Sequence, residues 1–149
     1  MNLSDIIRAD RVDLNLAAEN KDEAIRKLSH LLNESGALSD EQKYLDDVFE
    51  RERVSSTGIG NAIAIPHGKS SAVKETCAAI GRMKNTLNWG SADGEPVKFI
   101  VLLAVNDTDK NTSHVKLLSQ MARKLASDEV CQKLLDAKTR EEIVEIFSN

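Results

Sequence analysis

The residues best suited to chemistry lie in one short stretch, residues 57–69, with the sequence TGIGNAIAIPHGK. Its single histidine, His67, stands between Pro66 and Gly68. Proline fixes its own φ angle and restricts the residue before it, and glycine would let the chain turn directly after the histidine. Neutral imidazole is a competent nucleophile, because its unperturbed pKa is about 6.5. The alternative is an ordinary loop histidine, and the flanking residues favour a functional one.

Two common phosphate-binding motifs are excluded by a single residue. A dinucleotide fingerprint that began with GIG at 58–60 would need a third glycine at position 63, and so would a P-loop that ended with GKS at 68–70. Ile63 occupies that position. A phosphoryl group carried on His67 would instead need hydrogen-bond donors and positive charge around it. The glycine-rich backbone and Arg51 are the candidates for these roles.

His114 is the second candidate side chain. It lies in the first turn of a helix predicted over residues 113–126 and opened near Thr112, where free N–H groups and the helix dipole favour an anion. It shares a face with Leu118 and Met121, so its side chain should point inward. The alternative is a histidine that serves only the core. His30 lies inside a predicted helix and is given no role.

The other potentially reactive groups favour neither metal nor thiol chemistry. A metal site needs at least three ligands, and His67 and His114 supply two, without a His-x-x-x-His or Cys-x-x-Cys pair. No cofactor and no metal are implied. Cys77 falls in a predicted buried strand and Cys131 in an amphipathic helix, so both are predicted to be reduced core thiols.

An acidic cluster surrounds Arg51, late in a helix predicted from Ser39 to about residue 53. Its members are Asp46, Asp47, Glu50 and Glu52. Most such clusters form a solvated face, and this one could also meet a basic partner.

The composition limits the class of protein. Twenty Lys and Arg against 24 Asp and Glu give a formal net charge of −4, and aromatic residues make up 3% of the chain. Neither value suits a nucleic-acid binder, which normally has a basic face or stacking aromatics. The longest apolar run covers residues 99–105, against the ~20 residues that a membrane-spanning helix needs. Residues 1–5 do not begin a signal peptide, so a cytoplasmic protein without direct membrane insertion is expected.

The elements that would position these residues follow from periodicity and capping. Residues 12–16 alternate as a half-buried strand. Asn20 and Glu23 form a capping box that opens a helix, and Gly36 ends it. A second helix is expected from Ser39, paired with Gln42, to about residue 53.

The remainder of the chain is predicted to contain three strands and three helices. The strands cover residues 62–65, 77–83 and 98–105, and the last is apolar enough to be buried on both faces. The helices cover residues 113–126, residues 129–137, and a segment capped by Thr139 and Glu142. The order β-α-α-β-β-β-α-α-α predicts an α/β fold over residues 1–149 as a single domain, a three-layer α/β/α sandwich with a mixed sheet.

The stretch from Arg51 to Gly68 resembles the EIIA type-2 domain, the fructose/mannitol class, of the phosphoenolpyruvate-dependent phosphotransferase system (PTS). The match continues at residues 89–90, 93–97 and 114–118, so it covers nearly the whole chain. Trp89-Gly90 and the run DGEPV at 93–97 look more like the fructose-specific branch. One departure is Ala62, where many members have glycine.

The resemblance implies a phosphoryl carrier in sugar transport. In that family the histidine that matches His67 accepts phosphate from the phosphocarrier HPr and passes it to a cysteine of a IIB component, for uptake of fructose or a related sugar or polyol. The resemblance also implies that His114 stabilises the phosphoryl group and that Arg51 belongs to the same pocket. Neither cysteine has the Cys-Pro-x-Gly setting of a IIB site, so IIB and the membrane component IIC are expected on other chains.

Two other function classes stay open. Regulatory IIA proteins of the nitrogen-related system share the His67 signature and use phosphorylation as a switch. A hydrolase with a metal bound between His67 and His114 would be favoured only by stoichiometric zinc in the purified protein.

Overall fold

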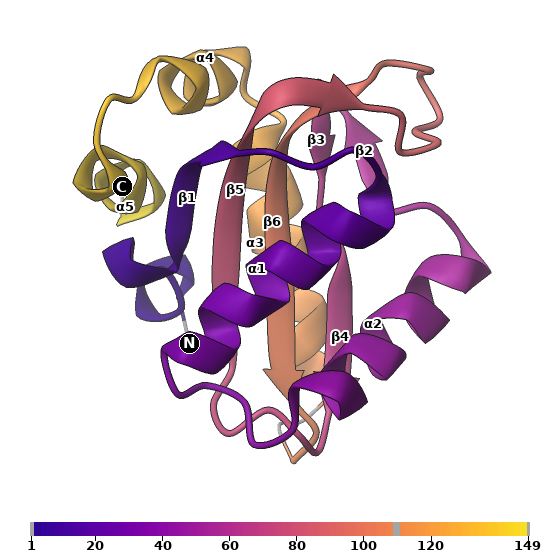
Figure 1. The fold of residues 1–149 in the computed structure, drawn as a ribbon. Helices are drawn as coiled ribbons and strands as arrows, with labels where there is room; N and C mark the ends of the chain where they lie inside the picture. The colour runs from indigo at the N-terminus through magenta and orange to yellow at the C-terminus, as the bar shows by residue number, and fades with distance from the viewer. Residues whose placement is uncertain (1, 109–110, 149) are drawn as a thin grey trace.

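The computed structural model describes residues 2–108 and 111–148, and the side chains of all of these except 111–113. Figure 1 shows a sheet between two layers of helices. Helices α1 (Lys21–Glu34) and α2 (Glu41–Val54) cover one face. Helix α3 (Asn111–Leu125) covers the other, with α4 (Asp128–Asp136) next to it, and α5 (Arg140–Ser148) packs against β1. The predicted three-layer α/β/α architecture is confirmed.

The sheet is mixed and has six described strands. They are β1 (Val12–Leu16), β2 (Gly58–Gly60), β3 (Ile63–Ala64), β4 (His67–Ser70), β5 (Cys77–Leu87) and β6 (Val97–Asn106), in the order β1-β5-β6-β3-β2, with β4 also paired to β6. Strands β3 and β4 run parallel to β6, whereas β5 runs antiparallel to it. The sequence pattern predicted β1, β3, β5 and β6 but not β2 and β4.

Each face of the sheet has its own hydrophobic core. Leu28, Tyr44 and Leu102 belong to the core beneath α1 and α2, whereas Leu103 and Met121 belong to the core on the α3 side. Alternate residues of β6 therefore serve opposite cores, which explains why this strand is apolar along nearly its whole length.

The ends of the first two helices show where the capping signals hold. Asn20 accepts the N–H of Glu23 and opens α1, as predicted. Gly36 ends α1 with a φ of 82°, a left-handed conformation that favours glycine. Helix α2 differs from the prediction, because Asp40 is its cap and accepts the N–H of Lys43. The N–H and hydroxyl of Ser39 are both directed at the carbonyl of Ala72 instead.

The turn between β2 and β3 shows why glycine would suit position 62, where this chain has alanine. Asn61 and Ala62 have φ angles of 55° and 64°, as a two-residue hairpin turn with both central residues left-handed requires. The Ala62 carbonyl accepts the N–H groups of Lys98 and Phe99 at 2.7 and 3.1 Å, which anchors the turn to β6. Glycine would occupy this conformation without strain, whereas alanine pays a steric penalty of about 1–2 kcal/mol.

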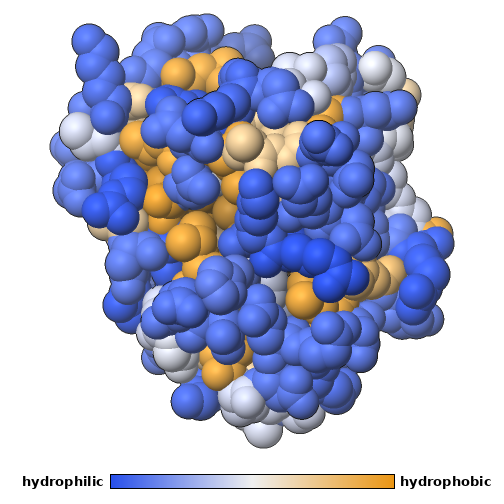
Figure 2. All heavy atoms as spheres, in the orientation of Figure 1, coloured by the Kyte–Doolittle hydropathy of each residue, from blue (hydrophilic) through white to orange (hydrophobic). Residues whose placement is uncertain are grey.

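The surface over α1 and α2 is mainly hydrophilic. Figure 2 shows hydrophilic side chains over most of this face, with the largest hydrophobic area at the upper left, above the region of β1 and the C-terminal helices. The apolar stripes of α1 and α2 are thus directed into the core. Among the described residues, no helix is long and apolar enough to cross a membrane.

Candidate phosphoryl-transfer site

His67 is the first residue of β4, whereas the predicted strand ended at residue 65 and left His67 outside the sheet. Residues 63–70 keep one register along β6, from Ile63 beside Phe99 to His67 beside Leu103. The line is interrupted only at residues 65–66. The side chain of His67 is therefore part-way along the sheet, on its α3 side, and the residue is 9% exposed.

Gly68 does not form the predicted turn. The chain continues through it as β4. A Cβ atom added at Gly68 would lie 2.8 Å from Cγ2 and 3.2 Å from the backbone nitrogen of Val48 in α2. Glycine is needed here because helix α2 packs directly on the strand. Consecutive strand residues point to opposite faces, so this contact directs His67 away from α2.

The hydrogen bond made by His67 defines which of its nitrogens is free. Nδ1 lies 2.9 Å from the main-chain oxygen of Ile65. A carbonyl oxygen can only accept, so the neutral ring carries its proton on Nδ1 and donates it to Ile65. The lone pair is then on Nε2. That nitrogen is the nucleophilic one in this arrangement.

His114 points inward, as its place on the helix face predicted, and lies beside His67, as the family resemblance implied. The two ring centroids are 5.5 Å apart and the rings meet edge to face, at 67°. His114 is half-buried, and its Nε2 is buried without a hydrogen-bond partner in the described part of the chain. An orphaned buried nitrogen is costly unless a ligand or water satisfies it. The predicted cap near Thr112 falls among side chains outside the described residues.

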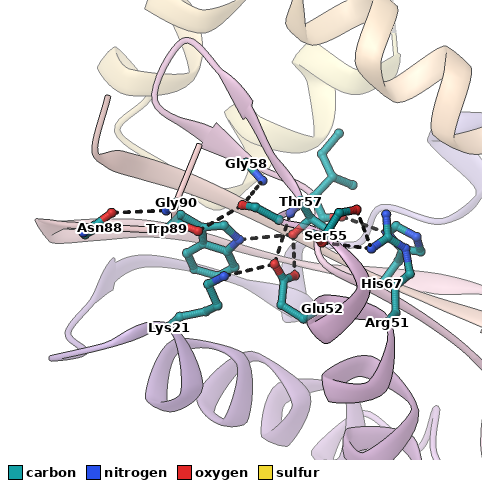
Figure 3. Close-up of polar contacts among 12 residues, drawn as sticks. Lys21, Arg51, Glu52, Ser55, Thr57, Gly58, His67, Asn88, Trp89 and Gly90 are labelled. Carbon is teal, nitrogen blue, oxygen red and sulfur yellow. Dashed lines mark hydrogen bonds and ion pairs between the residues drawn. The ribbon is translucent and has the colours of Figure 1, made fainter. Parts of the chain in front are cut away.

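Arg51 reaches the same place from the last turns of α2. Its Nη1 donates to the carbonyl oxygen of Ser55, at 3.0 Å. Figure 3 shows its guanidinium next to the His67 ring. The structure thus brings together all three residues that the sequence singled out: His67 from β4, His114 from α3 and Arg51 from α2.

The site favours neutral histidines. Burial lowers the pKa of His67, and the nearby Arg51 cation lowers it further, whereas the hydrogen bond to Ile65 acts in the opposite direction. Burial likewise lowers the pKa of His114, with further lowering from His67, Lys69 and Arg51. Near neutral pH both rings are therefore uncharged, and the Nε2 lone pair of His67 is available.

These shifts predict a specific loss of stability in acid. The unfolded chain binds protons on both histidines near pH 6.5, before the folded chain does, so the free energy of unfolding should fall as the pH drops below that value. A variant with His67→Gln and His114→Gln should lose less over the same range. Urea unfolding of both proteins at several pH values down to about pH 5 would measure this. Parallel pH profiles would contradict the assignment of neutral buried histidines.

The residues that hold the loop before His67 were not predicted from the sequence. Glu52 belongs to the acidic cluster that was expected to form a solvated face or to meet a basic partner, yet its side chain is only 7% exposed. It forms an ion pair with Lys21 at 3.1 Å and accepts two hydrogen bonds from Thr57, whose hydroxyl also accepts the indole N–H of Trp89 (Figure 3). In the sequence, Glu52 was linked to the site only by its position beside Arg51 in the stretch that resembles the family.

The remaining candidates stand apart from this site. Among the described residues, no group of three or more His, Cys, Asp or Glu side chains could hold a metal ion. Cys77 is buried, Cys131 is half-buried, and both are free thiols. Burial raises the pKa of Cys77 to about 11, which makes it a poor nucleophile. His30 is exposed between Glu34 and Glu41.

Known proteins resemble this chain along nearly its full length. The family model "Phosphoenolpyruvate-dependent sugar phosphotransferase system, EIIA 2" matches residues 5–149. The PTS system 2-O-alpha-mannosyl-D-glycerate-specific EIIABC component of Escherichia coli is 34% identical over 97% of this chain, which spans 22% of that relative. The mannitol-specific phosphotransferase enzyme IIA component of Geobacillus stearothermophilus is 35% identical, and the match covers 96% of this chain and 95% of that relative's length.

A solved structure has a similar fold. The nitrogen regulatory protein IIA-Ntr of Neisseria meningitidis superposes with a TM-score of 0.90 and 26% sequence identity, over 97% of this chain and 98% of its own.

Proposed function

Because the chain belongs to the EIIA 2 family of the phosphoenolpyruvate-dependent sugar phosphotransferase system, we propose that it is a phosphoryl carrier in which His67 is the phosphorylated residue. Members of this family are phosphotransferases. The single observation that carries the assignment is the His67 ring itself: Nδ1 donates a hydrogen bond to the Ile65 carbonyl, so the lone pair is on Nε2, and an arginine and a second histidine lie beside the ring.

The first transfer starts from phosphorylated HPr. The Nε2 lone pair of His67 attacks phosphorus, the new N–P bond forms, and the N–P bond to the HPr histidine breaks, with its electron pair left on that imidazole. His67 keeps its Nδ1 proton throughout, because that proton is held by the carbonyl of Ile65. No general base is needed, since a neutral imidazole has no proton on the attacking nitrogen.

The charge of the phosphoryl group is met by two neighbours. A phosphoryl group brings roughly −1.5 to −2 charges near neutral pH, by analogy with other phosphorylated side chains. Arg51 supplies a fixed positive charge and a planar pair of donors that suits two oxygens. His114 supplies the buried Nε2, which lacks a partner in the described residues and would donate an N–H to a phosphoryl oxygen.

Replacing Arg51 by alanine should slow phosphorylation of His67 about 10- to 100-fold, the factor expected for one hydrogen bond to a charged group. Arg51→Lys keeps the charge but loses the fork, so it should lie between alanine and the wild type. The measurement is the rate of labelling from phosphorylated HPr. An Arg51→Ala protein that lost only about 0.3–1 kcal/mol of stability, as a helix-terminal cation would, with normal transfer rates, would contradict the role.

The onward step passes the phosphoryl group to a IIB component. A cysteine thiolate of IIB attacks phosphorus, the N–P bond to His67 breaks, and the neutral imidazole is regenerated. We propose that this happens in the cytoplasm, with IIB on a separate chain that connects the carrier to the membrane component IIC and to uptake of fructose or a related sugar or polyol. The mannosylglycerate and mannitol names of the two relatives support a transport role.

A regulatory switch is the second candidate function. The likeness to the nitrogen regulatory protein of Neisseria meningitidis, at a TM-score of 0.90, favours it. Both functions use the same phosphorylated histidine and differ in what receives the phosphoryl group.

Transfer to purified IIB proteins distinguishes the two functions. The phosphorylated protein is mixed with IIB components specific for fructose, mannitol and related sugars, and the label on each is followed. A transport carrier transfers its label to one of them within seconds to minutes, and the variant IIB without its cysteine stays unlabelled. Retention of the label with every active IIB would reject the transport role and leave the regulatory one.

A further inference from the structure

The side chain of Glu52 is the least expected group near the site, because it is a buried carboxylate that the proposed transfer does not use. Burial of a charge is unfavourable unless partners replace the lost water. Glu52 has three such partners: Lys21 Nζ at 3.1 Å, the backbone N–H of Thr57 at 3.0 Å and the Thr57 hydroxyl at 2.6 Å. The carboxylate therefore fixes Thr57 from both its backbone and its side chain.

The direction of every hydrogen bond at Thr57 is determined. The indole Nε1 of Trp89 can only donate, and it lies 3.1 Å from the Thr57 hydroxyl oxygen. The hydroxyl accepts that bond and donates its own proton to Glu52. Trp89 is 1% exposed, so the Thr57 hydroxyl is what satisfies its N–H. Lys21 Nζ also lies over the indole ring of Trp89, 5.2 Å from its centroid (Figure 3). Lys21, Glu52, Thr57 and Trp89 are therefore one connected group.

The main chain of Thr57 connects this group to the histidine. The carbonyl of Thr57 accepts the N–H of Ile65 at 3.0 Å, and the carbonyl of Ile65 accepts the Nδ1 proton of His67 at 2.9 Å. Ile65 is thus held on one side by Thr57 and holds His67 on the other. Ser55, whose carbonyl binds Arg51, is only two residues before Thr57 on the same loop.

We propose that Lys21, Glu52, Thr57 and Trp89 are positioning residues: they fix Thr57, and through the Ile65 carbonyl they keep the proton of His67 on Nδ1 and its lone pair on Nε2. None of the four bonds directly to the ring in the described contacts. Their catalytic consequence rests on the proposed phosphorylation of His67, whereas the control of the imidazole tautomer is a property of the unphosphorylated protein.

The decisive variant is Thr57→Val, which keeps the shape of the side chain and removes its hydroxyl. Nitrogen-15 NMR of the unphosphorylated protein reports which ring nitrogen of His67 carries the proton. In the wild type Nδ1 should have the shift of a protonated nitrogen and Nε2 that of an unprotonated one. In Thr57→Val the two shifts should move toward each other, as the second tautomer becomes populated. Thr57→Ser keeps the hydroxyl and should restore the wild-type shifts.

The matched control is Arg82→Met. The Arg82 side chain donates to the carbonyls of Leu134, Leu135 and Ala137 at the end of α4, so its loss removes internal hydrogen bonds without touching the Thr57 group. It should leave the His67 shifts unchanged even where it lowers the melting temperature. If Thr57→Val does not fold, Trp89→Phe replaces it, because that change keeps an aromatic ring at the position and removes the N–H that donates to Thr57.

The transfer rate is a second readout. Misplacement of a reacting group by a fraction of an ångström to 1 Å can cost up to about 100-fold in rate, so we expect Thr57→Val to lower the maximal phosphorylation rate 10- to 100-fold, with the KM for phosphorylated HPr little changed. Unchanged His67 shifts in folded Thr57→Val, or in Trp89→Phe, would overturn the positioning role. A wild-type protein that is never phosphorylated would instead reject the proposed function, and the shifts would still decide the positioning role.

Discussion

The His67→Ala variant should take up no acid-labile phosphate from phosphoenolpyruvate, Enzyme I and HPr. The physical reason is that alanine removes the nitrogen lone pair on which the phosphoryl group is carried, and the free thiol of Cys77 is a poor substitute, with burial raising its pKa to about 11. The measurement is radioactive label or mass added to the intact protein, with the fold checked by circular dichroism.

His30→Ala is the control for that experiment. His30 lies on α1, where it is exposed between Glu34 and Glu41, and its loss should leave labelling at the wild-type level. Undiminished labelling of the His67→Ala protein would rule out His67 as the acceptor. Loss of label in both variants would show that the assay reports something other than the site.

The His114→Ala variant should still be labelled at His67 but should transfer about 10²–10³ times more slowly, the cost of removing one preorganised donor. The Nε2 of His114 has no hydrogen-bond partner among the described residues, and the ring that carries it lies beside His67, with the two ring centroids 5.5 Å apart. His114→Gln keeps an N–H of similar reach and should recover part of the rate. Stopped-flow or quench measurements of both the forward and the onward transfer would show this.

A histidine that serves only the core gives the opposite pattern. His114→Ala would then lower the melting temperature and leave both transfer rates unchanged. Measuring the melting temperature and the two rates on the same pair of variants therefore separates catalysis from packing.

The parts of the fold that local sequence signals encode were predicted. Strand β1 follows from the alternation of residues 12–16, helix α1 from the cap at Asn20 and the glycine at position 36, and β6 from its apolar run. Strand β4 was not predicted, because the run HGKS has neither alternation nor β-branched residues. Its conformation comes from pairing with β6, which is more than 30 residues away in the sequence.

The candidate site shows the same division. His67, Arg51 and His114 could be singled out by residue type, by local framing and by resemblance, and the structure brings them together. The environment of Glu52 could not be predicted in this way, because a carboxylate within an acidic run looks solvated until its partners are known. Lys21 lies on α1 and Trp89 in the loop between β5 and β6, so only the tertiary structure places them around Glu52.

The most direct test of the central claim is a phosphorus–nitrogen NMR experiment on the ¹⁵N-labelled protein phosphorylated by phosphoenolpyruvate, Enzyme I and HPr. We predict that phosphorus is coupled to Nε2 of His67, while Nδ1 keeps the proton that it donates to Ile65. Coupling to Nδ1 of His67, coupling to a nitrogen of His114, or no phosphorylated histidine at all in a reaction that labels a known EIIA protein, would contradict the account.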